Sequence, residues 1–234
     1  MNMESYQNPC IVSEAPEQTR AQFIRRTYTH LAGAVLAFVA LEFVLFQTGM
    51  PKAMMNLLAK SGYSWLIVLG SFMVVSWIAE KWASSGTSVE MQYVGLGVYV
   101  VAEAIIFVPL LYIAANLCSP DVIPTAAVIT LLLFGGLTYT AFTTKSDFSF
   151  LGGILKIGSF VALGIIVASI CFGFTLGLLF SAVMVLFAAG VILYTTGGIL
   201  HRYNTNQHVA AALSLFAAVA LMFWYVLRIF MSRR

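Results

Sequence analysis

Long apolar segments separated by short polar loops occupy the chain from about residue 27 to its C-terminal end. A bilayer core about 30 Å thick is crossed by about 20 apolar residues, at about 1.5 Å of helix rise each. This pattern predicts seven spans, near residues 27–47, 62–79, 92–115, 122–142, 150–171, 177–194 and 209–227. The predicted fold class is therefore all-α, a polytopic integral membrane protein.

The least certain break lies between the fifth and sixth spans. Residues 157–200 contain no charged side chain, and as one helix they would be about twice as long as a bilayer is thick. The segment must fold back, and Phe-Gly-Phe-Thr-Leu-Gly at residues 172–177 is the favoured turn. Seven helices is the preferred count, with six helices and a re-entrant segment as the alternative.

Composition narrows the class of protein further. Hydrophobic residues make up 61% of the 234 residues and charged residues 9%, with a mean hydropathy of +0.94. A soluble domain has about 45–50% apolar and about 25% charged residues. These values exclude a soluble enzyme and a disordered chain. The net charge of +3 is too small and too dispersed for a nucleic-acid-binding surface, so the bilayer is the expected partner.

The N-terminal segment differs from the rest of the chain. Residues 1–22 are predicted to form a polar tail, and residues 23–234 a single seven-helix transmembrane domain. Glu4, Glu14 and Glu17 interrupt the tail, which lacks the apolar core of a cleavable signal peptide. The first span is therefore expected to direct insertion.

Lys and Arg in the short loops predict the orientation. The N-terminal side carries seven of them and the opposite side five. The first group is Arg20, Arg25, Arg26, Lys81, Lys145, Lys156 and Arg202; the second is Lys52, Lys60, Arg228, Arg233 and Arg234. The N-terminus is therefore predicted to be cytoplasmic and the C-terminus to lie on the far side. Short loops and no targeting segment are compatible with a bacterial inner membrane.

Glu103 is the ionisable residue placed deepest in a predicted span. Such side chains are costly in lipid and usually face the bundle interior or water. Pro109 follows six residues later and frees the carbonyl of Ile105, which loosens the helix beside the acid. Glu103 is either a proton- or cation-responsive carboxylate in a cavity or a buried acid that only holds helices together.

Three other charged residues lie within or at the ends of spans. Glu42 is a second candidate for the ion pathway or for pH sensing, or it leans toward the interface. Lys156 anchors the fifth span by snorkelling or pairs with a carboxylate. Arg228 is an interfacial anchor or the partner of Glu103 or Glu42.

Cofactor and catalytic motifs are missing from the sequence. The three cysteines lack the spacing of a disulfide framework or a zinc site. His30, His201 and His208 have no Cys or acid beside them to complete a metal site. We therefore expect His201 and His208 to be solvated loop residues. Nucleotide-binding and serine-nucleophile motifs are also missing. The expectation is a protein that is not an enzyme and has no cofactor or bound metal.

Three stretches carry a family resemblance. They are Arg-Thr-Tyr-Thr-His-Leu-Ala at residues 26–32, Thr-Lys-Ser-Asp-Phe-Ser-Phe-Leu-Gly-Gly at residues 144–153, and the last span, with Ala-Ala-Leu-Ser-Leu-Phe at 211–216 and Tyr-Val-Leu-Arg-Ile at 225–229. Together they resemble the Bax inhibitor-1 family, also called the transmembrane Bax inhibitor motif family. The resemblance extends from about residue 23 to residue 229.

This resemblance implies a bundle of seven helices with the last helix at its centre. It also implies a pH-dependent calcium leak across a membrane and a role in cytoprotection or stress tolerance, and bacterial relatives include regulators of a membrane-embedded protease. Glu103 and Arg228 match charged positions that recur in the family. Two family aspartates are replaced here, by Thr195 and Ala218, which can neither titrate in the same range nor supply carboxylates to Ca²⁺.

Two hypotheses follow. The first is a passive cation pathway, with Ca²⁺ as a candidate ion, Glu103 lining it and Arg228 as the counter-ion. The second is a non-conducting interaction protein that modulates a membrane protease or another membrane protein. The oligomeric state stays open, and a monomer is plausible.

Overall fold

The computed structural model describes residues 10–61, 63–84, 88–144 and 147–232. A short 3-10 helix, η2 (Val12–Glu14), precedes the α-helices of this part of the chain. These are α1 (Glu17–Gln47), α2 (Met50–Ala59), α3 (Ser64–Ala83), α4 (Val89–Leu117), α5 (Val122–Thr143), α6 (Leu151–Phe172), α7 (Leu178–Gly197), α8 (Ile199–Arg202) and α9 (His208–Met231).

Seven of these helices are long and apolar enough to cross a membrane: α1, α3, α4, α5, α6, α7 and α9. The prediction of seven spans is therefore confirmed. The predicted turn is also found, because α6 ends at Phe172 and Gly173 adopts a left-handed conformation with φ of 71°. Glycine reaches this conformation without the steric penalty that a side chain imposes.

Two differences from the sequence-based prediction stand out, beside shifts of about one turn or less at other helix ends, such as that of α3. Helix α1 begins at Glu17, inside the segment predicted to be a polar tail. Helix α2 occupies a segment predicted to be a loop, where Pro51 sits in the first turn, the position at which proline favours a helix start. Of the residues used in the prediction, Glu4, Gly62, Lys145, Ser146, Arg233 and Arg234 lie outside the described residues.

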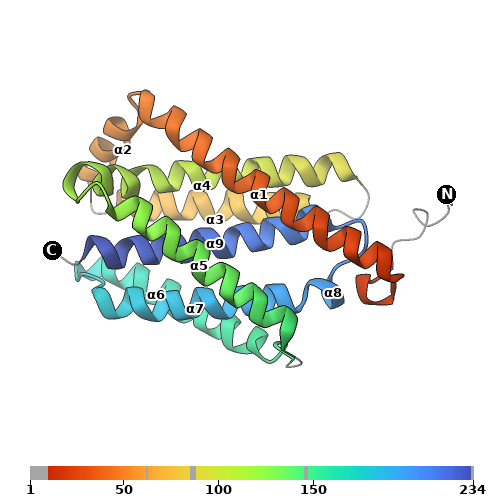
Figure 1. Cartoon of the computed structure of the whole chain (residues 1–234). Coiled ribbons are helices and arrows are strands. Elements are labelled where there is room, and N and C mark those ends of the chain that lie inside the picture. The colour runs from red at the N-terminus through yellow and green to blue at the C-terminus, as the bar shows by residue number, and fades with distance from the viewer. Residues whose placement is uncertain (1–9, 62, 85–87, 145–146, 233–234) are drawn as a thin grey trace.

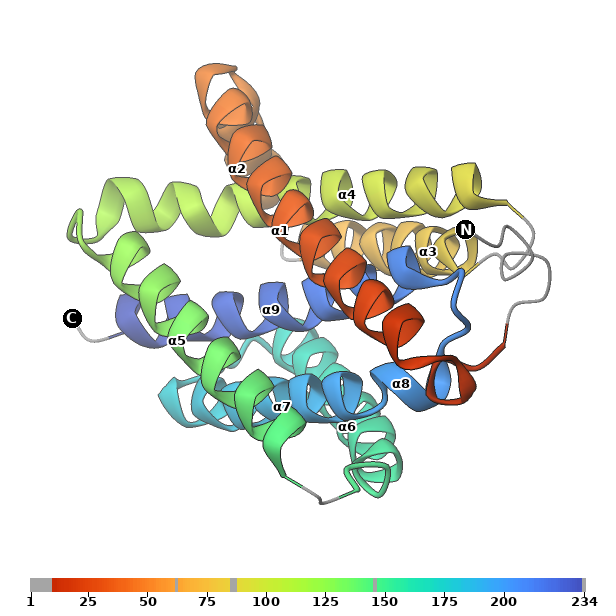
Figure 2. The ribbon, with the colours of Figure 1, turned by 45° about the vertical axis from the view of Figure 1, so that its right-hand side comes forward.

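Helix α9 lies at the centre of the bundle, and α4, packed between α3 and α1, is nearly as buried (Figures 1 and 2). In the apolar windows of α4 and α9, 67% and 72% of the residues are buried, against 11–28% in the other five spanning helices. Large apolar side chains on the outer helices, such as Leu36, Phe43 and Leu132, point outward, where lipid would contact them. The central position of the last helix, implied by the family resemblance, is confirmed.

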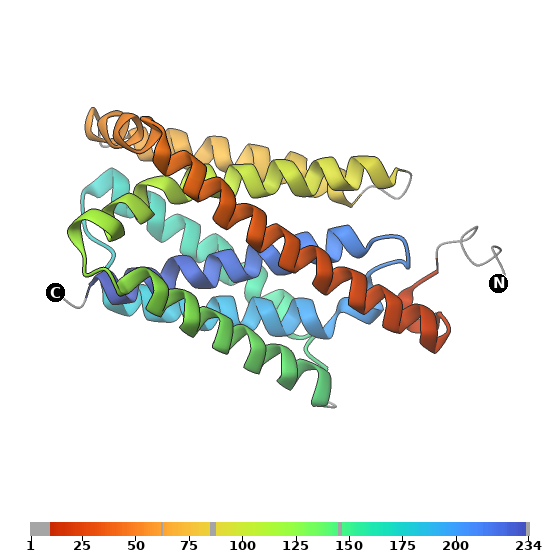
Figure 3. The same ribbon diagram turned by 45° about the horizontal axis from the view of Figure 1, so that its top comes forward.

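The outer helices cover different faces of α9. Helices α1 and α5 cross in front of it in Figure 1, α3 packs along α4, and α7 packs along α9. Figure 3 shows α6 crossing behind α9, α7 running alongside α9, and the start of α1 and the end of α9 at opposite ends of the bundle. This arrangement separates the face covered by α1 and α5 from the face covered by α6.

A strap of N-terminal residues closes one end of the bundle. The backbone N–H of Val12 donates to the carbonyl of Tyr203 at 3.0 Å, and that of Thr205 donates to the carbonyl of Cys10 at 3.0 Å. The side chain of Val12 is fully buried against Ile199 and Val209. The segment before α1 is thus fixed to the loop before α9.

A close approach between two spanning helices involves Gly95 of α4. A Cβ atom added there would overlap the backbone of Ala79 and Ala83 of α3. Small residues at such a crossing let two backbones approach, which is how helices gain packing energy in lipid. The α3–α4 pair therefore depends on this glycine.

We expect Gly95→Ala to destabilise the protein by about 1–3 kcal/mol, because the added methyl group must push two backbones apart. Gly97→Ala is the matched control, since a Cβ at residue 97 meets no atom within 4 Å. Removing a helix-interior glycine there is neutral or stabilises by up to about 1 kcal/mol. Reversible unfolding in mixed micelles measures the free energy of unfolding of both variants. Equal stability of the two would contradict the close packing of α3 against α4 at Gly95.

Candidate functional site

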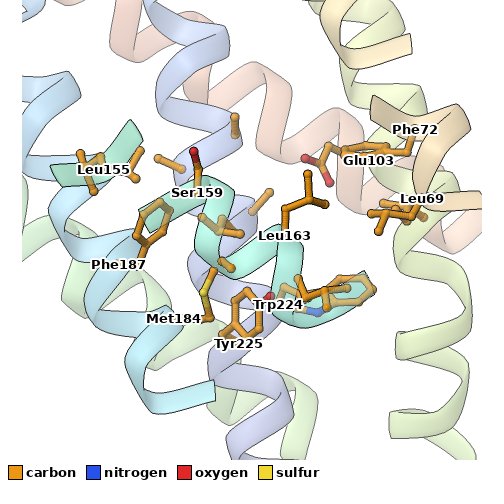
Figure 4. A pocket seen from close by; sticks show the side chains of 18 of the residues that line it. Leu69, Phe72, Glu103, Leu155, Ser159, Leu163, Met184, Phe187, Trp224 and Tyr225 are labelled. Carbon is orange, nitrogen blue, oxygen red and sulfur yellow. The ribbon is translucent and has the colours of Figure 1, made fainter. Parts of the chain in front are cut away.

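A cavity of about 870 Å³ lies beside α9, between the α3–α4 pair on one side and α6 and α7 on the other (Figure 4). Its lining comes from α3, α4, α6, α7, α9 and the turn before α7. Most lining side chains are apolar, including Leu69, Leu163 and Phe187. The polar groups among them are few, which makes their positions informative.

Five residues singled out from the sequence line this cavity. They are Glu103 of α4, Lys156 of α6, Thr195 of α7, and Ala218 and Arg228 of α9. The two positions at which the family carries aspartates thus face the same space as the candidate acid and both candidate bases. The structure brings together side chains that lie far apart in the sequence.

These charged groups lie at three depths of the bundle. Lys156 belongs to the second turn of α6, at the end where the N-terminus lies, and Glu103 lies halfway along α4. Arg228 lies near the end of α9, at the opposite end. Because Gly152 and Glu80 also line it, the cavity extends along most of the bundle, from the start of α6 to the Arg228 end of α9.

Glu103 is buried, with 6% of its surface exposed, and its carboxylate points into the cavity (Figure 4). Tyr99 lies one helical turn earlier on the same face, and its hydroxyl interacts with this carboxylate. Because α4 is central, Glu103 cannot extend to the lipid headgroups. Any water, proton or cation that meets it must arrive through the cavity.

Arg228 does not form an ion pair with Glu103 among the described residues. Its guanidinium instead donates to the carbonyl of Leu176, in the turn before α7, at 3.2 Å. Arg228 thus anchors the α6–α7 turn to α9 and supplies positive charge at that end of the cavity. Lys156 is exposed, as expected for a side chain near the interface.

Glu42 is the candidate that the structure leaves outside the cavity. It belongs to α1, on the face of the bundle away from α6. Its exposed fraction is 8%, and neither carboxylate oxygen has a hydrogen-bond partner in the described part of the chain. Glu42 and Glu103 are therefore two buried carboxylates, of which one faces the cavity.

Glu80 is a cavity residue that the sequence analysis missed. The prediction ended the second span at residue 79, whereas α3 continues to Ala83 and Glu80 lines the cavity. Trp65, Leu69 and Phe72 recur at helical spacing on the same face. Two further helical turns from Phe72 reach Glu80, so this spacing in the sequence could have placed Glu80 on the cavity face.

The end of the cavity near the N-terminus is closed by the loop before α9. The hydroxyl of Tyr203 donates to Oγ of Ser214 at 3.0 Å, and Ser214 lines the cavity. Burial raises the pKa of Tyr203 above its ordinary value, so this hydroxyl stays protonated at neutral pH. The N-terminal strap holds the backbone of the same tyrosine.

Asp147 organises the turn before α6. The hydroxyl of Ser149 donates to one carboxylate oxygen at 2.7 Å and its backbone N–H to the other at 2.8 Å. These two hydrogen bonds, the side-chain one first, lower the pKa of Asp147. This acid therefore has a structural role at the start of the helix that bears Lys156.

The histidines are arranged differently from the prediction. The expectation that His208 is a solvated loop residue is wrong, because it begins α9, is buried, and places its ring 4.9 Å from that of His30. His30 also makes a hydrogen bond to Tyr93 at 2.9 Å. Across the described ranges no group of three or more His, Cys, Asp or Glu side chains could hold a metal ion.

Comparison with known proteins identifies the family. A family model described as "Inhibitor of apoptosis-promoting Bax1" matches residues 20–234. The chain belongs to the Bax inhibitor-1 family. The match includes every spanning helix from α1 to α9, so the resemblance drawn from the three motifs is confirmed.

A curated relative extends the comparison to a bacterium. It is "Uncharacterized protein PA2604" of Pseudomonas aeruginosa, 34% identical over 111 residues. The matched segment is 47% of this Bax inhibitor-1 family chain and 50% of the relative, so it spans about half the length of each protein.

We expect water to fill the cavity of this Bax inhibitor-1 family member, and two buried serines provide the test. Ser169 of α6 lines the cavity, whereas Ser181 of α7 does not, and both are less than 9% exposed. The native cysteines, Cys10, Cys118 and Cys171, are first replaced by serine. A water-soluble thiol reagent should then modify Ser169→Cys about tenfold faster than Ser181→Cys, because thiol reactivity requires access. Equal rates would indicate a dry cavity.

Proposed function

We propose that this protein is a passive cation pathway, with Ca²⁺ as a candidate ion and Glu103 as the central cation-facing group. One observation carries the proposal: Glu103 lies halfway along a buried helix and faces a cavity that extends to the Arg228 end of the bundle. A carboxylate in that position costs free energy unless water or a cation reaches it. The protein acts without catalysis in this proposal.

Oxygen atoms along the cavity suit a hard cation. Glu80 and Glu103 supply carboxylates, and Tyr99, Ser214 and Thr195 supply hydroxyls. Ca²⁺ takes six to eight oxygen ligands, so an ion that passes these groups keeps part of its water. Weak, incomplete coordination favours a leak over tight binding, because a permeant ion must also leave.

The proposed setting is a bacterial cytoplasmic membrane with the N-terminal end inside. Arg20, Arg25, Arg26, Lys81 and Arg202 gather at that end, as the preference of Lys and Arg for cytoplasmic loops requires. A leak of this kind suits the cytoprotective role that the family resemblance implies. The alternative function is a non-conducting protein that modulates a membrane protease or another membrane partner.

Calcium flux into liposomes that contain the purified protein tests this proposal. We expect a protein-dependent flux, and Glu103→Gln should lower it about tenfold or shift its pH dependence, because the barrier for the ion rises by about 1.4 kcal/mol. Glu42→Gln is the matched control. It removes an equally buried carboxylate outside the cavity and should leave the flux unchanged.

Two results would contradict the cation pathway. One is flux no greater than that of empty liposomes at every pH tested, which would favour the interaction role. The other is an equal loss of flux in the Glu42 and Glu103 variants, which would assign the loss to general disturbance of the bundle.

A further inference from the structure

Aromatic rings line the same wall of the cavity as Glu103, the wall formed by α3, α4 and α9. The ring centroids of Phe72 and Tyr99 are 6.4 Å apart, and those of Phe107 and Trp224 are 4.9 Å apart. Trp65 stacks on Trp224 at 6.2 Å, which links α3 to α9. All five side chains line the cavity together with Glu103.

The charge of Glu103 has no cationic partner among the described residues. Tyr99, its neighbour on the helix, offers a hydroxyl but no positive charge. The guanidinium of Arg228 is bonded to Leu176 near the end of α9, and Lys156 lies on α6 in its second turn. The wall formed by α3 and α4 is therefore aromatic and acidic, with Glu80 beside Glu103, and the basic residues lie on α6 and α9.

A carboxylate and aromatic rings on the same wall favour one class of ligand, organic cations. Aromatic faces carry partial negative charge and attract cations that lie within about 6 Å of the ring centre. An inorganic ion keeps its water and gains little from these rings, whereas an organic cation with apolar substituents can contact them directly. Apolar side chains such as Leu69, Ile106 and Leu163 would contact the apolar substituents of such a cation.

We propose that this cavity binds lipophilic monovalent organic cations, such as quaternary ammonium or phosphonium compounds, with Glu103 as the charge partner. The volume of about 870 Å³ lies within the range of about 300–1,000 Å³ that is typical of small-molecule sites. Glu80 and Glu103 attract a cation to the wall formed by α3 and α4, and Lys156 and Arg228 repel it from α6 and from the far end of α9. The inference rests on the same cavity as the proposed function, but it does not require that the protein conduct ions.

Two ions of nearly the same size and shape test this directly. Tetraphenylphosphonium is a cation and tetraphenylborate an anion, so a site that is merely apolar would accept both. Binding is measured to the full-length protein in nanodiscs, with empty nanodiscs subtracted for partition into lipid. We expect tetraphenylphosphonium to bind at least about tenfold more tightly than tetraphenylborate, a factor that corresponds to one favourable buried charge contact.

Substitutions test which residues produce the preference for tetraphenylphosphonium over tetraphenylborate. Glu103→Gln should weaken tetraphenylphosphonium binding about tenfold or more and abolish the preference over the anion, while Glu42→Gln changes neither. Glu103→Asp keeps the charge and should retain most of the preference. Phe72→Leu keeps an apolar side chain without the ring and should weaken binding about three- to tenfold.

The outcomes separate this inference from the proposed function. Charge-selective binding that depends on Glu103 supports the organic-cation site even if no calcium flux is found. Equal binding of the two ions overturns it, as does tetraphenylphosphonium binding that Glu103→Gln leaves unchanged. If Glu103→Gln fails to fold, the Phe72→Leu variant and the comparison of the two ions in the native protein still decide the question.

Discussion

The burial of α4 and α9 inside a ring of lipid-facing helices is the constraint on which the rest of the structure depends. Water is absent from the bilayer core, so each spanning segment satisfies its own backbone hydrogen bonds as a helix. Two helices are then mostly withdrawn from lipid, with 67% and 72% of their apolar windows buried, and the other five pack around them. Close approach at Gly95 brings α3 against α4, and this pair forms one wall of the cavity.

This constraint gives Glu103 its importance. On an outer helix a carboxylate at mid-depth would face lipid, and near a helix end it could reach the headgroups. On α4 it does neither, so its surroundings are the aromatic wall, the Tyr99 hydroxyl and the cavity. The same acid serves both proposals: a small hydrated cation passes it, and a lipophilic cation is held beside it.

Much of the fold could be predicted from the sequence, because bilayer thickness fixes the length of an apolar span. The turn at Gly173 was predictable from the unbroken uncharged stretch around it. Helix α2 and the early start of α1 were not, because short amphipathic segments beside a membrane resemble loops in composition. The position of Glu103 was predicted, since a mid-span acid must face inward.

The sequence could not predict which acidic side chains line the same cavity, because that depends on how the helices rotate and pack. Glu42 and Glu103 look alike in the sequence and are almost equally buried, yet α1 lies on the face of α9 away from the cavity. Glu80 was missed because one helix end was placed a turn too early. Arg228 was expected to be either an interfacial anchor or a counter-ion of Glu103 or Glu42, and its guanidinium donates to the carbonyl of Leu176.

Infrared difference spectroscopy of the carboxyl groups tests most directly whether cations meet the protein at Glu103. Spectra of the reconstituted protein with and without Ca²⁺ should differ in the carboxyl and carboxylate bands. Glu103→Gln should remove the larger part of that difference and leave only the part due to Glu80, whereas Glu42→Gln should keep it whole. An unchanged spectrum on adding Ca²⁺, or a difference that Glu103→Gln leaves undiminished, would contradict the central role of this residue.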